Sequence, residues 1–141
     1  MMRCPRFAAL ALAVLGSALL VACVGAPEGV AQLSGDHALV QRSQDGSVEA
    51  TVQLDSARLS RGVNDFSITL RAADGSAEPV LKSVDAVMAA HGHSASAPNI
   101  MNDGQLFHAD LDLFMSGRWQ IELGVELDAS SDRVEFALDV P

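Results

Sequence analysis

From residue 47 onward, apolar and polar side chains alternate with a period of two residues, and this pattern restricts the fold more than any other feature. The clearest segment sets Val48, Ala50, Val52 and Leu54 between polar neighbours. Successive side chains of a β-strand point to opposite faces, so such a segment predicts a strand with one buried face. Similar alternation occurs in segments 66–71, 80–88, 107–113, 119–126 and 134–138. No segment here has the spacing of an amphipathic helix, and we predict an all-β domain.

Six or seven short strands separated by turns are typical of an antiparallel β-sandwich. We therefore predict a sandwich of about seven strands over residues 46–141. Segment 80–88 alternates less cleanly than the others, which indicates a β-bulge. Trp119 is the only tryptophan of the chain, and we expect it to fill the core.

Residues 1–22 have the organisation of a secretion signal. Arg3 and Arg6 precede an apolar run over residues 7–21. This run is shorter than the roughly 20 apolar residues that a membrane-spanning helix needs. A basic start followed by a short apolar core is typical of a signal peptide that is removed from the mature protein.

The apolar run ends in Leu20-Val21-Ala22-Cys23, which resembles the lipobox of bacterial lipoproteins. The resemblance implies cleavage after Ala22, thioether lipidation of Cys23 and acylation of its new amino group. The alternative is an ordinary signal peptide followed by a cysteine that stands there by chance. Two or more acyl chains hold a soluble domain stably at a bilayer. The lipoprotein interpretation therefore predicts a lipid-anchored protein of the cell envelope that faces the periplasm, at either the inner or the outer membrane.

Residues 23–45 are predicted to form the lipidated N-terminus and a flexible tether. Glycine, proline and small polar residues punctuate this stretch, and no apolar period persists in it. A stretch of this kind would hold the folded domain clear of the membrane. The pattern allows one short strand, near residues 38–40.

Charge and motifs exclude several classes of function. The chain has 18 acidic and 9 basic side chains, a formal charge of −9, and an acidic surface repels the phosphates of nucleic acids. The chain contains no nucleophile elbow, no phosphate-binding loop and no dinucleotide fingerprint. Its carboxylates fall at solvent-facing positions of the predicted strands, where pairing any two as acid and base would be arbitrary. We predict a protein that is not an enzyme and does not bind nucleic acid.

The segment from Met88 to Met101 gathers residues that can bind a soft metal ion. It contains Met88, His91, Gly92 and His93 within six residues. Thioether sulfur beside imidazole suits copper, especially Cu(I). In an extended segment His91 and His93 would project to the same side. The alternative is an exposed turn that binds nothing, next to methionines that belong to the core.

Zinc is a weaker prediction than copper. The chain has no His-Glu-x-x-His helix and no cysteine ligand in the domain. Only His37 or His108 could serve as a distant third imidazole. His108 is expected on the polar face of its strand, solvated beside Asp110.

Three motifs in order resemble the YtkA-like domain, which is related to FixH-like proteins. They are Arg61-Gly62-x-Asn64-x-Phe66, Met88-x-x-His91-Gly92-His93, and Met115-x-Gly117-x-Trp119. Ala89 stands where this family has proline, which puts the entry angle of the loop in doubt.

The resemblance implies an exported, immunoglobulin-like β-sandwich over essentially the whole mature domain. It also implies a link to the copper supply of respiratory oxidases, with their assembly factors or other envelope proteins as partners. By position, it assigns Met88, His91 and His93 as metal ligands and adds Met115. The competing hypothesis is a non-catalytic interaction or assembly protein of the cell envelope, in which the His-Gly-His loop is structural.

Overall fold

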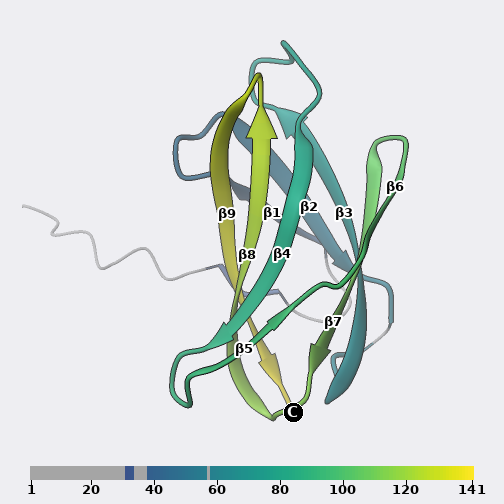
Figure 1. Ribbon diagram of the computed structural model, residues 1–141, viewed down its shortest axis with the longest axis vertical. Coiled ribbons are helices and arrows are strands. Elements are labelled where there is room, and N and C mark those ends of the chain that lie inside the picture. The colour runs from purple at the N-terminus through teal and green to yellow at the C-terminus, as the bar shows by residue number, and fades with distance from the viewer. Residues whose placement is uncertain (1–30, 34–37, 57) are drawn as a thin grey trace, which may run out of the picture.

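The computed structural model describes residues 31–33, 38–56 and 58–141, and every element in this part of the chain is a β-strand (Figure 1). The strands are Leu39–Arg42 (β1), Val48–Leu54 (β2), Gly62–Ala72 (β3), Val80–Met88 (β4), His93–Ser96 (β5), Ile100–Asp103 (β6), Leu106–Leu113 (β7), Gly117–Leu127 (β8) and Ser130–Val140 (β9). The prediction of an all-β domain is confirmed. These nine strands of the described residues exceed the predicted number because β1, β5 and β6 have four residues each, too few for an alternating pattern to stand out.

Two antiparallel sheets form the predicted sandwich. The five-stranded sheet has the order β1-β2-β3-β7-β6, and the four-stranded sheet has the order β5-β4-β8-β9. The chain crosses from one sheet to the other between β5 and β6, which are therefore edge strands of different sheets. The register of β4 shifts between Leu81 and Ser83, which confirms the bulge predicted for this strand.

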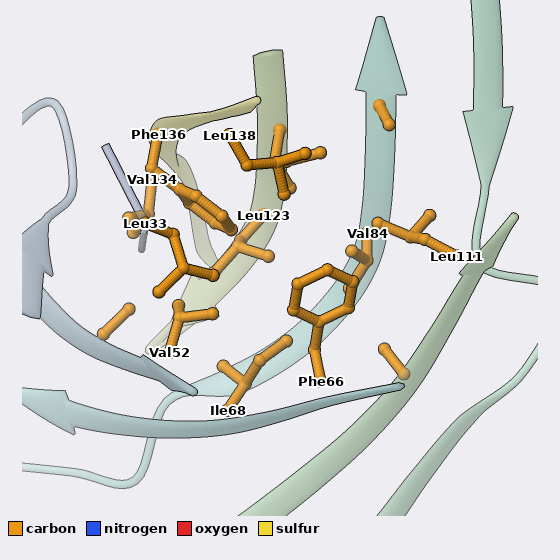
Figure 2. Packing of buried hydrophobic residues seen from close by; sticks show 14 of the residues in the cluster. Leu33, Val52, Phe66, Ile68, Val84, Leu111, Leu123, Val134, Phe136 and Leu138 are labelled. Atoms are coloured by element: carbon orange, nitrogen blue, oxygen red, sulfur yellow. The ribbon is translucent and has the colours of Figure 1, made fainter. Parts of the chain in front are cut away.

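The core lies between the two sheets. Figure 2 shows Phe66 and Ile68 of the five-stranded sheet facing Leu123 and Phe136 of the four-stranded sheet. These side chains are almost completely buried, and so is Trp119, whose exposed fraction is 0%. Burial of this apolar surface is the main force that holds the sheets together.

The sandwich begins earlier than the sequence predicted. Strand β1 pairs with β2, and Leu33 is 2% exposed within the core. Gln32 forms a parallel bridge with Ala137 of β9. Strand β1 matches the short strand that the pattern allowed near residues 38–40. The tether predicted for residues 23–45 therefore does not reach residue 45, because one buried leucine and one short edge strand leave little trace in a local pattern.

The predicted signal peptide and Cys23 lie outside the described residues, as does His37. No helix in the described part of the chain is long and apolar enough to cross a membrane.

Candidate metal site

Two of the sequence motifs meet at one end of the sandwich. The β4–β5 hairpin carries the Met88 and His motif, and the β7–β8 connection carries Met115 and Gly117. Both connections lie at the end where the chain terminates, at the bottom of Figure 1. A Cβ atom added to Gly117 would stand 3.4 Å from the Cε methyl of Met88. The two motifs are therefore in contact, although more than twenty residues separate them in the chain.

Met88 and His93 face each other across the hairpin. Met88 is the last residue of β4, His93 is the first of β5, and the register pairs them directly. Residues directly opposite each other in an antiparallel pair project from the same face of the sheet. Met88 is 1% exposed, so this is the face that looks into the sandwich. The partly exposed imidazole of His93 therefore projects from the same face of the sheet as the side chain of Met88, at the rim of the core.

A tight turn places His91. The carbonyl oxygen of Met88 accepts hydrogen bonds from the backbone N–H groups of His91, at 3.1 Å, and of Gly92, at 2.9 Å. Gly92 has a φ of 66°, a left-handed conformation that glycine adopts at little cost. His91 thus lies in an exposed turn, which is the alternative to an extended segment that the sequence left open. The turn nevertheless brings the two imidazole rings together, with their centroids 6.4 Å apart and their planes inclined by 31°.

Phe114 is a part of the site that the sequence analysis missed. Its ring packs edge-on against His93, with centroids 5.5 Å apart, and edge-on against Trp119, with centroids 5.6 Å apart. Phe114 is 45% exposed. The signal that could have revealed it is the break in alternation after Leu113, where a second apolar residue follows the last inward-facing one. Phe114 therefore connects the imidazole of His93 with the buried indole of Trp119.

Met115 belongs to the same end but has a different environment. Its side chain is partly buried and packs against the core, while its carbonyl oxygen accepts a hydrogen bond of 3.0 Å from Nε1 of Trp119. Trp119 therefore fills the core as predicted and also fixes the backbone next to Met115.

The spacing of the two imidazole rings at this end lies at the outer limit for sharing one metal ion. Two imidazoles that share an ion with metal–nitrogen bonds of about 2.0–2.1 Å have ring centroids separated by no more than roughly 6.5 Å. The separation of 6.4 Å between His91 and His93 lies near this limit, which corresponds to a nearly linear arrangement. In the described part of the chain no three His, Cys, Asp or Glu side chains gather closely enough to hold an ion. A metal site at this end would therefore need methionine sulfur beside the imidazoles, the donor set that suits Cu(I), and a third ligand would require the two rings to move closer together.

His108 lies elsewhere, on the outer face of the five-stranded sheet. It is on the polar face of β7 and partly exposed, as predicted, but its contacts are with β2 and β3 rather than with Asp110. Its Nδ1 lies 3.3 Å from Oγ of Ser67 and 3.6 Å from Oδ2 of Asp55, which follows β2. His108 is therefore not a ligand of the candidate site.

A pair of carboxyl groups on the same outer face is expected to make the stability of the folded protein depend on pH. Asp65 of β3 stands directly opposite Asp110 of β7. A hydrogen bond with the Asp110 carboxyl, reduced hydration, and the negative charges of Asp110 and Asp55 all raise the pKa of Asp65 above its ordinary value of 3.8. A folded state with a raised carboxyl pKa is stabilised by protonation, so this contribution is lost as the pH rises through that pKa.

We therefore expect Asp65→Asn to raise the free energy of unfolding at pH 7, where it removes like charges that face each other across two strands. The gain should shrink as the pH falls through the raised pKa of Asp65, because the carboxyl group then becomes protonated in the folded wild type. Urea denaturation over a series of pH values from 7 downward measures this difference. Asp112→Asn on β7, opposite Val63, is the matched control. An equal gain from both substitutions, independent of pH, would show that the Asp65–Asp110 pair makes no pH-dependent contribution to the free energy of unfolding.

An open cavity of about 540 Å³ lies at the other end of the sandwich. Its lining includes Leu70 at the end of β3 and Phe107 at the start of β7, together with Glu78 and Gln105, which share a hydrogen bond of 3.4 Å. Gly62 and Leu113, at the other ends of β3 and β7, pair with each other. They lie nearer than the cavity does to the β4–β5 turn that carries His91. The cavity is therefore separate from the candidate metal site.

Comparison with known proteins gave no match to a protein-family model, to a curated protein or to a solved structure.

Proposed function

We propose that this protein is a lipid-anchored, periplasm-facing lipoprotein. Met88, His91, His93 and Met115, at one end of the sandwich, would bind Cu(I) or pass it to a partner, without catalysing a bond change. The observation that carries the proposal is the pairing of Met88 with His93 across the β4–β5 hairpin, with the ring of His91 close by. Imidazole and thioether are donors that Cu(I) accepts readily. The aromatic ring of Phe114 packs edge-on against the imidazole of His93.

The surroundings suit an ion that must be taken up and released. His91 is exposed and His93 is partly exposed, whereas Met88 is buried beneath them. An ion held by the imidazoles would remain accessible to a donor or acceptor protein at the rim of the sandwich. The resemblance to YtkA-like and FixH-like proteins supports the same function, with factors that assemble respiratory oxidases, or other envelope proteins, as partners.

A non-catalytic interaction or assembly protein of the cell envelope is the second candidate. The burial of Met88 favours it, because a thioether this deeply buried is also explained by packing in the hydrophobic core next to Gly117. Partly exposed Phe114 and the edge strand β5 would then form part of a protein-binding surface. Titration of the purified protein with Cu(I) against a competing chelator, followed at the methyl resonance of Met88, separates the two candidates, because only the first requires uptake of the ion beside this residue.

The lipid anchor can be tested independently of copper. We expect Cys23→Ala to abolish incorporation of labelled fatty acid and to release the protein from the membrane fraction, because Cys23 is the proposed site of thioether lipidation. Cys4→Ala is the matched control, since the proposed cleavage removes this cysteine with the signal. If the Cys23→Ala protein still incorporates fatty acid, the lipoprotein assignment is wrong.

A further inference from the structure

The outer face of the five-stranded sheet carries a second pairing of methionine with histidine. Met101 of β6 stands directly opposite His108 of β7, so both side chains project from the same face, with Cβ atoms about 4.5–5.5 Å apart. The neighbours of His108 in β7, Phe107 and Ala109, are buried, which places the pair on the outside of the sandwich. Met101 is 62% exposed, so its side chain is not held by core packing.

The hydrogen bonds of His108 leave one ring nitrogen available to a metal ion. Oγ of Ser67 donates its hydrogen to Oδ1 of Asp55, so its lone pairs face Nδ1 of His108, 3.3 Å away. Oδ2 of Asp55 lies 3.6 Å from the same nitrogen. Two acceptors therefore surround Nδ1, and the neutral imidazole carries its proton there. The lone pair is then on Nε2, which makes no hydrogen bond with any residue that the structure describes.

This arrangement is the one found around metal-bound histidines. A ligating imidazole almost always donates its other N–H to a carboxylate or another acceptor, which fixes the tautomer and makes the free nitrogen more basic. Here Asp55 and Ser67 provide this support, so Asp55 acts on the imidazole and need not touch the ion. The acidic side chains of Asp65 and Asp110 on the same face also raise the local concentration of cations.

We propose that Met101 and His108 form a second Cu(I) site, distinct from the site of the β4–β5 turn. Thioether sulfur and a neutral imidazole suit Cu(I), and the exposed position leaves room for a third ligand from a donor or acceptor protein. His108 is five residues from Leu113, the last residue of β7 and the neighbour of Phe114. At about 3.3 Å per residue this separation is roughly 17 Å, so the two sites cannot share one ion.

The test uses protein expressed from the full-length chain and labelled with ¹³C at the methionine methyl groups. Ag(I), a closed-shell ion that stands in for Cu(I), is titrated while the methyl and imidazole resonances are recorded. We expect the Met101 methyl and the His108 ring to shift together and to reach saturation. The Met101 shift should disappear in His108→Asn, whose amide nitrogen replaces Nδ1 but offers nothing at the position of Nε2. The His108 shift should disappear in Met101→Leu, which keeps an apolar side chain without sulfur.

The double variant H91A/H93A separates the second site from the first. It should leave the Met101 shift intact, because the proposed sites are independent. Shifts of the Met101 methyl that vanish in H91A/H93A would overturn the second site.

The distribution of the shifts over the methionines completes the test. Shifts confined to Met88 and Met115 would overturn the second site and leave the first in place. Shifts of Met101 and His108 alone would instead support the second site and overturn the site at the turn.

Discussion

Replacing His91 and His93 together by alanine is expected to weaken Cu(I) binding at the β4–β5 turn by at least about 100-fold. Even the loss of a group that only orients a metal ligand costs about 10- to 100-fold in affinity, and this variant removes two direct ligands. The measurement is a titration with Cu(I) against a chelator of known affinity, with the methyl resonance of Met88 as a reporter specific to this site. The reporter is needed because the Met101–His108 pair would bind an ion of its own.

Ser94→Ala is the matched control for the double variant. Ser94 follows His93 in β5 but pairs with Val87, so its side chain projects from the opposite face of the sheet. We expect no change in the affinity of the control, and no loss of stability in the double variant, because His91 is exposed and His93 lies at the rim. Unchanged affinity in the double variant would refute the copper-binding function and favour the envelope-interaction protein.

Trp119→Ala is expected to lower the free energy of unfolding by about 3–5 kcal/mol, the usual cost of truncating a large buried aromatic residue. The indole has an exposed fraction of 0%, and it supports the ring of Phe114 and donates a hydrogen bond to the carbonyl of Met115. Trp119→Phe should cost less, because it keeps most of the apolar volume but leaves that carbonyl without its donor. Denaturation in urea at neutral pH measures both variants.

Gln120→Ala is the control for Trp119, because Gln120 is the next residue of β8 and points to solvent. A surface substitution of this kind changes stability by about 0.5 kcal/mol or less. A loss of less than about 1 kcal/mol in Trp119→Ala would mean that the end of the sandwich relaxes around the missing ring. The role assigned to Trp119 in positioning Met115 and Phe114 would then be wrong.

The long strands could be predicted from the sequence because each carries its own evidence. In β2, four inward-facing apolar residues alternate with polar ones, and the structure buries Val48, Ala50, Val52 and Leu54 as the pattern indicates. Of the short strands, only β1 was anticipated, as the strand allowed near residues 38–40. Strand β6 exists because Ile100–Asp103 pairs with the long strand β7, and a partner that is distant or separated by a turn cannot be recognised from four residues alone.

The candidate metal site, too, could be predicted from the sequence only in part. The sequence indicated Met88, His91 and His93 by their chemistry, but it left both an extended segment and an exposed turn open. The structure has a turn closed on the carbonyl of Met88, with the two imidazole rings close to each other. The contribution of Phe114 depends on the meeting of two connections from different sheets. The pairing of Met101 with His108 depends on the register of β6 against β7.

The sequence by itself determined the all-β class, the buried face of each long strand and the kinds of donor atom available for a soft ion. These properties follow from the order of apolar, polar and sulfur- or nitrogen-bearing side chains along short segments. Only the tertiary structure decided which donors are neighbours, where the sandwich begins and which nitrogen of His108 is free. Those properties depend on strand register and on contacts between residues far apart in the chain, because a shift of one residue moves every side chain of a strand to the other face.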